Sequence, residues 1–150
     1  ILCVDRRIAR SMRLALHDLS KRRSVDEIAN AVGLSRTHFS RRFHFLMAVS
    51  FPEWSTLVRI KEAKELLKVI DLSITGVAAS VGYSDVTTFA RVFRKYESMS
   101  PRDYRMTLLG SRTDPAERTP MTEFADSAVQ FADLLVPNAE TEQRLSLDTR

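Results

Sequence analysis

Apolar residues recur every three or four positions through the first 110 residues of this chain, the spacing that places them on one face of an α-helix. Glycine and proline are scarce there, and no segment alternates apolar and polar residues as a half-buried strand does. The pattern predicts an all-α body of short helices. In chain order, the expected apolar stripes are Ile8, Met12, Ala15, Leu16 and Leu19; Ile28, Ala29 and Val32; Phe39, Phe43 and Leu46; Trp54, Leu57, Ile60, Ala63, Leu67 and Ile70; Val77, Ala78 and Val81; and Phe89, Phe93 and Tyr96.

Small polar residues precede these stripes, where they can accept hydrogen bonds from the first free backbone N–H groups of a helix. They are Asp5, Ser24, Ser35, Ser50, Ser73, Ser84 and Ser100. Ser24 and Glu27 have the spacing of a capping box, and Gly33 and Gly82 lie where two short helices should end in a left-handed turn. The longest stripe predicts a helix over about 52–69, with four basic side chains toward solvent: Arg59, Lys61, Lys64 and Lys68.

One part of the pattern occurs twice. The series Ala29, Gly33, Ser35 recurs 49 positions later as Ala78, Gly82, Ser84, and the series Phe39, Arg41, Phe43 recurs 50 positions later as Phe89, Arg91, Phe93. A small residue, a glycine four positions on and then a capped helix with aromatic anchors suit two helices that cross at a tight angle. A single corner of this kind occurs in many bundles that never touch nucleic acid, but two copies favour a pair of helix-turn-helix units.

The second copy carries a family resemblance. Residues 74–85 (ITGVAASVGYSD), 89–96 (FARVFRKY) and 99–105 (MSPRDYR) resemble the signature of the DNA-binding domain of the AraC/XylS regulators, and the likeness extends over about residues 4–106. It implies an all-α, homeodomain-like fold in which two helix-turn-helix subdomains are joined by a long linker helix. We expect this domain at 4–107, with the first helix-turn-helix at about 24–46, the linker helix at about 52–69 and the second helix-turn-helix at about 73–96.

The resemblance also implies a function. The chain is expected to be a bacterial, cytoplasmic transcription regulator that inserts two recognition helices into adjacent major-groove segments of double-stranded DNA. Activation of transcription is the expected outcome, although the residues themselves do not separate an activator from a repressor. Three positions depart from the family pattern: Ala48 and Ser98 replace the glycines that usually end the recognition helices, and Gly76 replaces a residue that favours helix. A left-handed Ala or Ser costs roughly 1 kcal/mol relative to glycine.

A helical wheel predicts which side chains would meet DNA, because the faces opposite the aromatic stripes must point outward. Arginine can hold guanine with two hydrogen bonds, Ser and Thr suit either base type, and Val or Ala can contact a thymine methyl. We predict base contacts by Thr37, Ser40, Arg41, His44, Val86, Thr87, Ala90 and Arg91. Phosphate contacts are predicted for residues at helix starts or flanks: Ser35, Arg36, Arg42, Ser84, Arg94 and Lys95. The alternative for each is an ordinary solvated helix surface. Six aromatic residues are interpreted as core, because their spacing is helical and inward: Phe39, Phe43, Phe89, Phe93, Trp54 and Tyr104.

The charge is distributed unevenly over the 150 residues. Residues 1–110 carry 19 basic and 11 acidic side chains, a net charge of +8, whereas the last 40 residues have a net charge of −4. A polyanion would therefore bind the first part. Cys3 has no second cysteine for a disulfide, and His17, His38 and His44 share no metal-ligand spacing, so neither a metal site nor a cofactor is expected. No apolar run is long enough to cross a bilayer.

Two rival functions have to be compared with DNA binding. An enzyme is disfavoured, because the chain has no phosphate-binding glycine loop and no arrangement of nucleophile, base and acid that can be defended. A protein-interaction module would use the same fold to bind RNA polymerase or another regulator, and polymerase contact is compatible with DNA binding. Because the chain begins with Ile1 inside a helical pattern, dimerisation through a missing upstream domain also stays open.

The last part of the chain differs from the rest. Residues 108–150 are expected to form a linker and an acidic tail, in which Met121, Phe124, Ala128, Phe131 and Leu135 have helical spacing. One amphipathic helix, from Thr119 to about Leu135, is the expectation, and an unstructured tail is the alternative. Such a helix would need a partner surface, either on the basic module or on another protein.

Overall fold

The computed structural model describes residues 5–110, so the expected tail helix lies outside the described residues. Within that range the chain forms seven α-helices and no strand, as the periodicity predicted. They are α1 (Arg6–His17), α2 (Val25–Ala31), α3 (Arg36–Met47), α4 (Phe51–Leu67), α5 (Ile74–Ser80), α6 (Val86–Glu97) and α7 (Pro101–Gly110). None of the described helices is long and apolar enough to span a membrane.

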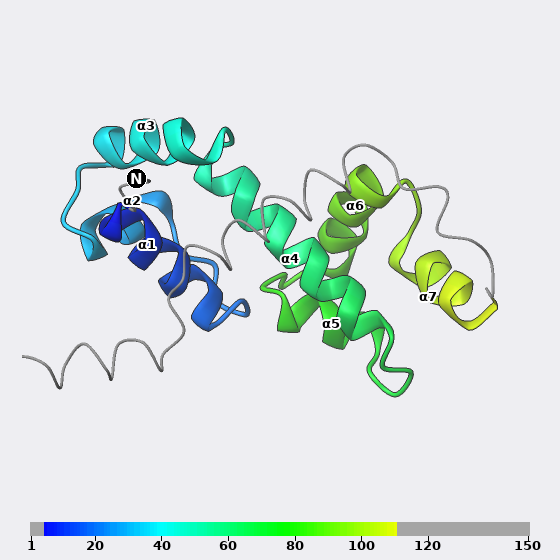
Figure 1. Ribbon diagram of the computed structural model, residues 1–150. Coiled ribbons are helices and arrows are strands. Elements are labelled where there is room, and N and C mark those ends of the chain that lie inside the picture. Colours follow the sequence, from blue (N-terminus) through cyan, green and yellow to red (C-terminus); the bar gives the residue numbers. More distant parts are fainter. Residues whose placement is uncertain (1–4, 111–150) are drawn as a thin grey trace, which may run out of the picture.

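Helix α4 runs diagonally through the molecule and joins two groups of helices (Figure 1). We call α1, α2 and α3 with the first half of α4 the first unit, and α5, α6 and α7 with its second half the second unit. Each unit has its own buried core. Helix α4 gives Phe51, Trp54 and Val58 to the first core and Ile60, Ala63 and Leu67 to the second.

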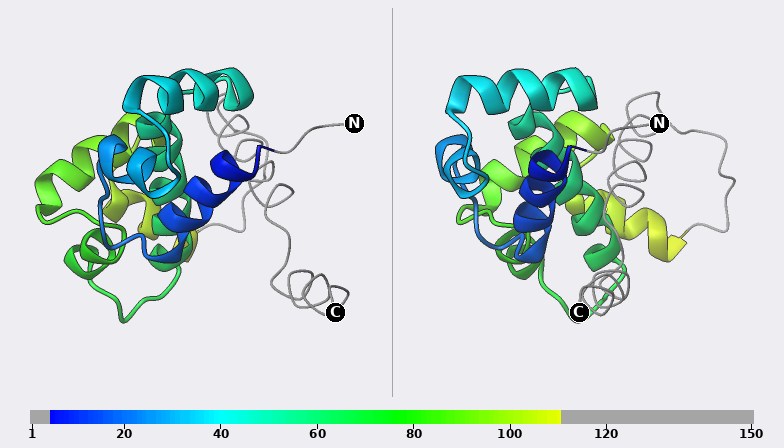
Figure 2. Two further views of the ribbon diagram at one scale, coloured as in Figure 1. Left: turned by 90° about the vertical axis from the view of Figure 1, so that its left-hand side faces the viewer. Right: turned by 60° about the vertical axis from the view of Figure 1, so that its left-hand side comes forward.

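The two triplets of α4 point in opposite directions, because successive helical residues are rotated by about 100°. The two units therefore pack on opposite sides of α4, which explains why its buried apolar side chains lie on two faces instead of the single stripe expected from the sequence. In the left view of Figure 2 the first unit faces the viewer, with α3 across the top and α1 and α2 beneath it.

The predicted helix starts are largely confirmed. Asp5, Ser24, Ser35, Ser50 and Ser73 each accept a hydrogen bond from a backbone N–H in the first turn of the following helix. The capping box is complete, since the Glu27 carboxylate accepts from the Ser24 N–H at 2.6 Å and Ser24 Oγ accepts from the Glu27 N–H at 3.2 Å. Gly33 and Gly82 have φ of 69° and 85°, the left-handed turns expected after α2 and α5.

Three predictions about the long helix were wrong. It ends at Leu67 rather than near Val69, and Ile70, expected on the inward stripe, is 65% exposed. The backbone N–H groups of Lys68 and Val69 bond to carbonyls three residues earlier, which tightens the last turn. Arg59, expected in solvent, is only 3% exposed because the loop between α1 and α2 covers it.

Candidate nucleic-acid interface

Helix α3 has one buried and one exposed face. Phe39, Phe43 and Met47 pack into the first core, and Ser35 Oγ caps the helix by accepting from the His38 N–H at 3.2 Å. Every base-contact candidate on this helix is exposed: Thr37, Ser40, Arg41 and His44. The structure therefore places them together on one outward surface, with the polar groups that base edges require.

Two of the predicted phosphate-binding cations on α3 already have carboxylate partners. Arg36 Nη1 lies 2.9 Å from the Asp26 carboxylate, and Arg42 Nε donates to the Asp5 carboxylate. Burial by itself would raise the pKa of Asp5, but the hydrogen bonds from Arg42 and from the backbone of Arg7 and Ile8 lower it below its ordinary value. Asp5 is consequently ionised at neutral pH, and it links the start of α1 to α3.

Helix α6 repeats the arrangement in the second unit. Phe89 and Phe93 are fully buried in the second core, while five of its candidates are exposed and one, Ala90, is partly buried. The exposed ones are Val86, Thr87, Arg91, Arg94 and Lys95. The Lys95 ammonium lies 5.6 Å from the centroid of the Tyr96 ring. In Figure 1, α3 and α6 lie at opposite ends of α4 and toward its upper side.

The start of α6 was predicted wrongly. Ser84 was expected to cap this helix, but the N-cap is Asp85, whose carboxylate accepts from the backbone N–H groups of Thr87 at 3.2 Å and Thr88 at 2.9 Å. Between the glycine turn and the aromatic stripe, the second copy of the repeat has one residue more than the first, and this moves the cap by one position. The Thr88 hydroxyl also donates to Asp85 at 2.7 Å, and these hydrogen bonds lower the pKa of Asp85. A fixed negative charge thus occupies the N–H groups that we expected to receive a phosphate.

Comparison with known families decides what this arrangement is. A family described as a helix-turn-helix domain, of the AraC type, matches residues 28–107, more than half of the chain. The chain belongs to the AraC-type helix-turn-helix family. Members of this family are DNA-binding transcription regulators, so the family and the all-helical fold expected from the sequence are confirmed.

Individual relatives agree with the AraC-type assignment. An uncharacterized HTH-type transcriptional regulator of Staphylococcus aureus is 34% identical over 82 residues, which are 55% of this chain and 11% of that protein. The regulatory protein PocR of Salmonella typhimurium is 30% identical over 104 residues, 69% of this chain and 34% of that protein. The chain therefore spans only a small part of the length of these curated relatives.

Solved structures show the same AraC-type fold. The crystal structure of the DNA-binding domain of AdpA in complex with a target DNA is 28% identical, with a TM-score of 0.67, and the match covers 70% of this chain and 95% of that domain. The C-terminal domain of AraT, a response regulator from Geobacillus stearothermophilus, is 24% identical with a TM-score of 0.68, over 77% of this chain and 94% of that domain. The second likeness concerns the fold alone.

The departures from the AraC-type pattern have a structural outcome. Ala48 and Ser98 end α3 and α6 with φ of 60° and 61°, so each adopts the left-handed conformation in place of glycine. Gly76 lies in the first turn of α5, where its N–H donates to Ser73 Oγ at 2.9 Å. A side chain there would meet Leu72 Cδ1 at 2.9 Å, so glycine lets Leu72 lie against α5.

One exposed residue of the AraC-type recognition helix was missed by the sequence analysis. Phe45 on α3 is 84% exposed, the largest exposure among the large apolar side chains of residues 5–110. It lies four residues after Arg41, on the same outward side. The available signal was that Phe45 falls outside the stripe of Phe39 and Phe43, and the sequence analysis gave it no role. Its counterpart 50 positions later is Lys95.

Proposed function

We propose that this chain is the DNA-binding module of a transcription regulator and that α3 and α6 enter two adjacent major-groove segments of double-stranded DNA. The observation that carries this proposal is the pair of equivalent helices at opposite ends of α4, each with a buried aromatic face and an exposed polar one. Helix α4 has 17 residues and rises about 25 Å. We expect it to hold the two recognition helices about one DNA turn, roughly 34 Å, apart.

The base-reading residues are proposed from their exposure and chemistry. Arg41 and Arg91 occupy equivalent positions and suit guanine. Polar contacts on either side come from Thr37, Ser40, His44 and Thr87, and apolar contacts to thymine methyl groups come from Val86 and Ala90. The AdpA domain, which was crystallised with a target DNA, supports DNA as the partner of this fold.

Phosphate contacts position the protein without specifying sequence. We propose Ser35, Arg36 and Arg42 for the first unit and Ser84, Arg94 and Lys95 for the second. Arg36 and Arg42 would have to share their charge between a phosphate and the carboxylates of Asp26 and Asp5. Their contribution should therefore be smaller than that of Arg94, for which no carboxylate partner is among the ion pairs of residues 5–110.

The test begins with selection of bound sequences from random duplexes, followed by titrations on the selected site. Arg41→Ala and Arg91→Ala should each weaken binding by about 1–3 kcal/mol and relax the sequence preference at one half of the site. Lys68→Ala is the charge-matched control, since Lys68 is exposed on the turn after α4 and pairs with Glu65 at 2.8 Å. It should leave the preference unchanged.

Other outcomes have definite meanings. Equal weakening on all duplexes would assign Arg41 and Arg91 to phosphate, and binding without any sequence preference would favour the protein-interaction module. Catalysis is not part of the proposal, because family and fold are those of DNA-binding regulators. Contact with RNA polymerase, dimerisation through an upstream domain, activation and a cytoplasmic location stay predictions.

A further inference from the structure

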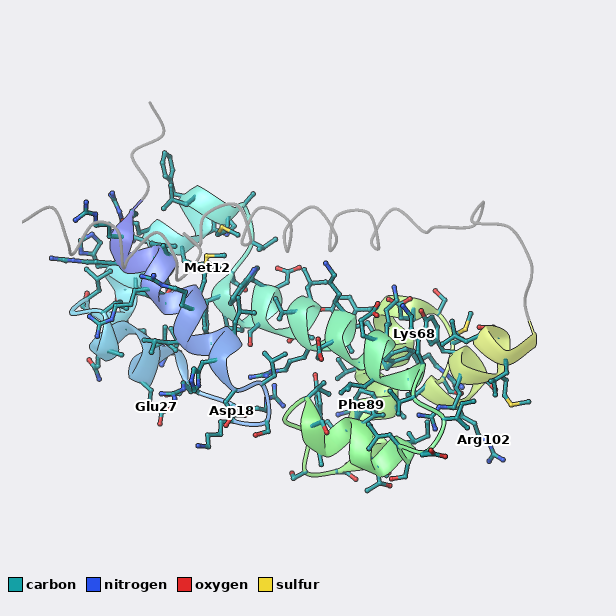
Figure 3. All side chains as sticks on the ribbon, turned by 60° about the horizontal axis from the view of Figure 1, so that its bottom comes forward. Met12, Asp18, Glu27, Lys68, Phe89 and Arg102 are labelled. Atoms are coloured by element: carbon teal, nitrogen blue, oxygen red, sulfur yellow. The ribbon has the colours of Figure 1, made fainter. Side chains whose placement is uncertain are left out.

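The two units touch each other away from α4. The loop between α1 and α2 and the turn after α5 lie side by side, as both Figure 1 and Figure 3 show, with Asp18 labelled at the start of the loop in Figure 3. We call residues 19–22 with Gly82 and Tyr83 the inter-unit contact. It joins a loop of the first unit directly to the helix-turn-helix turn of the second.

Backbone meets backbone in the inter-unit contact. A Cβ atom built on Gly82 would lie 2.6 Å from the carbonyl oxygen of Leu19 and 3.3 Å from that of Ser20. Real Cβ atoms essentially never approach an oxygen that closely, so any side chain at position 82 would force the two units apart. Glycine here is required twice, by the close approach and by φ of 85°.

A second interaction orients the same surfaces. The Arg22 guanidinium carbon lies 4.9 Å from the centroid of the Tyr83 ring, which is within the range of a cation–π interaction. Tyr83 is buried, and its ring packs 5.5 Å from that of Phe89 on α6. Arg22 of the first unit is thus connected through one aromatic ring to the buried side of the second recognition helix.

Helix α4 holds the loop from its other side. Arg59 Nη1 donates to the Leu19 carbonyl at 2.6 Å, and Nη2 lies 3.3 Å from the Lys21 carbonyl. The Leu19 oxygen that accepts from Arg59 is the same oxygen that faces Gly82. The loop therefore lies between α4 and the turn of the second unit, and it cannot shift without breaking these partly buried hydrogen bonds.

We propose that the inter-unit contact sets the distance and angle between α3 and α6 in the free protein, and so dictates the spacing between the two DNA segments that the protein accepts. Helix α4 connects the units through the chain itself, and the inter-unit contact adds the close approach at Gly82 and the Arg22–Tyr83 interaction. With the units held in this way, binding at both segments requires no further ordering. The inference rests on the proposed binding to two major-groove segments.

The chain offers a matched pair of variants for the test. Gly33 and Gly82 occupy equivalent turns with positive φ, but a Cβ on Gly33 would meet nothing within 4 Å. Gly33→Ala and Gly82→Ala therefore introduce similar backbone strain, and only Gly82→Ala separates the units. Each is combined with Cys3→Ser, Asn30→Cys and Thr107→Cys in the full chain. Spin labels at these two exposed positions on α2 and α7 then report the distance between the units without DNA.

The parent chain and Gly33→Ala should give one narrow distance, whereas Gly82→Ala should give a broad distribution. On DNA, the parent should lose affinity when one or two base pairs are inserted between the two segments of the selected site. Gly82→Ala should bind the original site more weakly, on the order of tenfold, tolerate the insertions, and keep its affinity for a duplex with a single segment. Arg22→Ala, an exposed and milder change, should shift both measurements in the same direction.

Equal behaviour of Gly33→Ala and Gly82→Ala would overturn the inference, as would a Gly82→Ala chain that keeps a narrow distance. If Gly82→Ala does not fold, Arg22→Ala decides by the same criteria. A parent chain with a narrow distance that accepts every spacing would overturn this inference while leaving the proposed function intact. A parent chain without any sequence preference would overturn the proposed function.

Discussion

The two units share one plan but differ in the helix that closes each core. Helix α4 follows α3 as α7 follows α6, and Phe51 and Trp54 of α4 correspond to Pro101 and Tyr104 of α7, each 50 positions later. Phe51 and Trp54 are buried, whereas Tyr104 is partly exposed. The first unit is thus closed by the helix that also carries the second unit, and the second unit by a helix that ends the described chain.

The units are also similar in a way that the repeat does not show. Each has an arginine that binds backbone carbonyls of the segment before its helix-turn-helix: Arg59 binds those of Leu19 and Lys21, and Arg105 binds those of Leu67, Val69 and Leu72. The two arginines are 46 positions apart, not 50, so Arg105 lies one helical turn earlier in its helix. Arginines at two non-equivalent positions therefore bind the backbone of the segment that precedes each helix-turn-helix.

The largest difference between the units should appear in their cores. Phe43 and Phe93 are both fully buried, but the Phe43 ring packs against those of Phe39, Phe51 and Trp54, whereas the Phe93 ring packs against Phe89 and Tyr104. Replacing a buried Phe by Ala costs about 3–5 kcal/mol. Urea unfolding should place Phe43→Ala at the upper end of this range and Phe93→Ala below it.

Equal losses for the two variants, with unchanged m-values, would mean that the additional ring around Phe43 contributes nothing to the free energy of unfolding. A second transition in either variant would show that the two units unfold separately, and the inter-unit contact would then be weaker than its geometry suggests.

The comparison also shows what the sequence could predict. Helix order, the capping residues of the first unit and the two glycine turns followed from local rules, because spacing and capping chemistry are local. The burial of Arg59 did not follow, since it depends on a loop 40 positions away that covers one side of α4. Phe45 was missed although its signal is local: it lies outside the stripe of Phe39 and Phe43, and its position on α3 leaves it exposed.

The caps of the two recognition helices offer a reciprocal exchange with a moderate expected effect. Ser35 is neutral and Asp85 is charged, and both accept from first-turn N–H groups. Asp85→Ser keeps an acceptor but removes a negative charge from the expected DNA-facing end of α6, so DNA binding at low salt should tighten several-fold. Ser35→Asp should weaken it. Both changes in DNA affinity should become smaller as the salt concentration of the titration is raised. Changes in affinity that do not depend on salt would contradict an electrostatic origin.

The same exchange has a pH signature. Hydrogen bonds, first of all the one from Thr88, lower the pKa of Asp85 below its ordinary value of 3.8 in the folded chain. A carboxyl with a lowered pKa stabilises the fold above its unfolded pKa, and this contribution is lost as the pH falls through the folded pKa. Below pH 3.8 the parent chain should therefore lose stability relative to Asp85→Ser, as thermal unfolding at a series of pH values would detect.

The smallest expected effect concerns the two left-handed exits, at which the units are alike. Ala48 and Ser98 are exposed and have φ of 60° and 61°, so replacing either by glycine removes backbone strain without removing a buried contact. Glycine also gains conformational freedom in the unfolded chain, which offsets part of the benefit. Ala48→Gly and Ser98→Gly should each raise the free energy of unfolding, by less than about 1 kcal/mol. Ala79→Gly, at an exposed position inside α5, is the control and should lower it by a similar amount, because glycine weakens a right-handed helix. If all three variants were destabilised alike, the exits of α3 and α6 would not be strained, and their left-handed conformation would need another explanation.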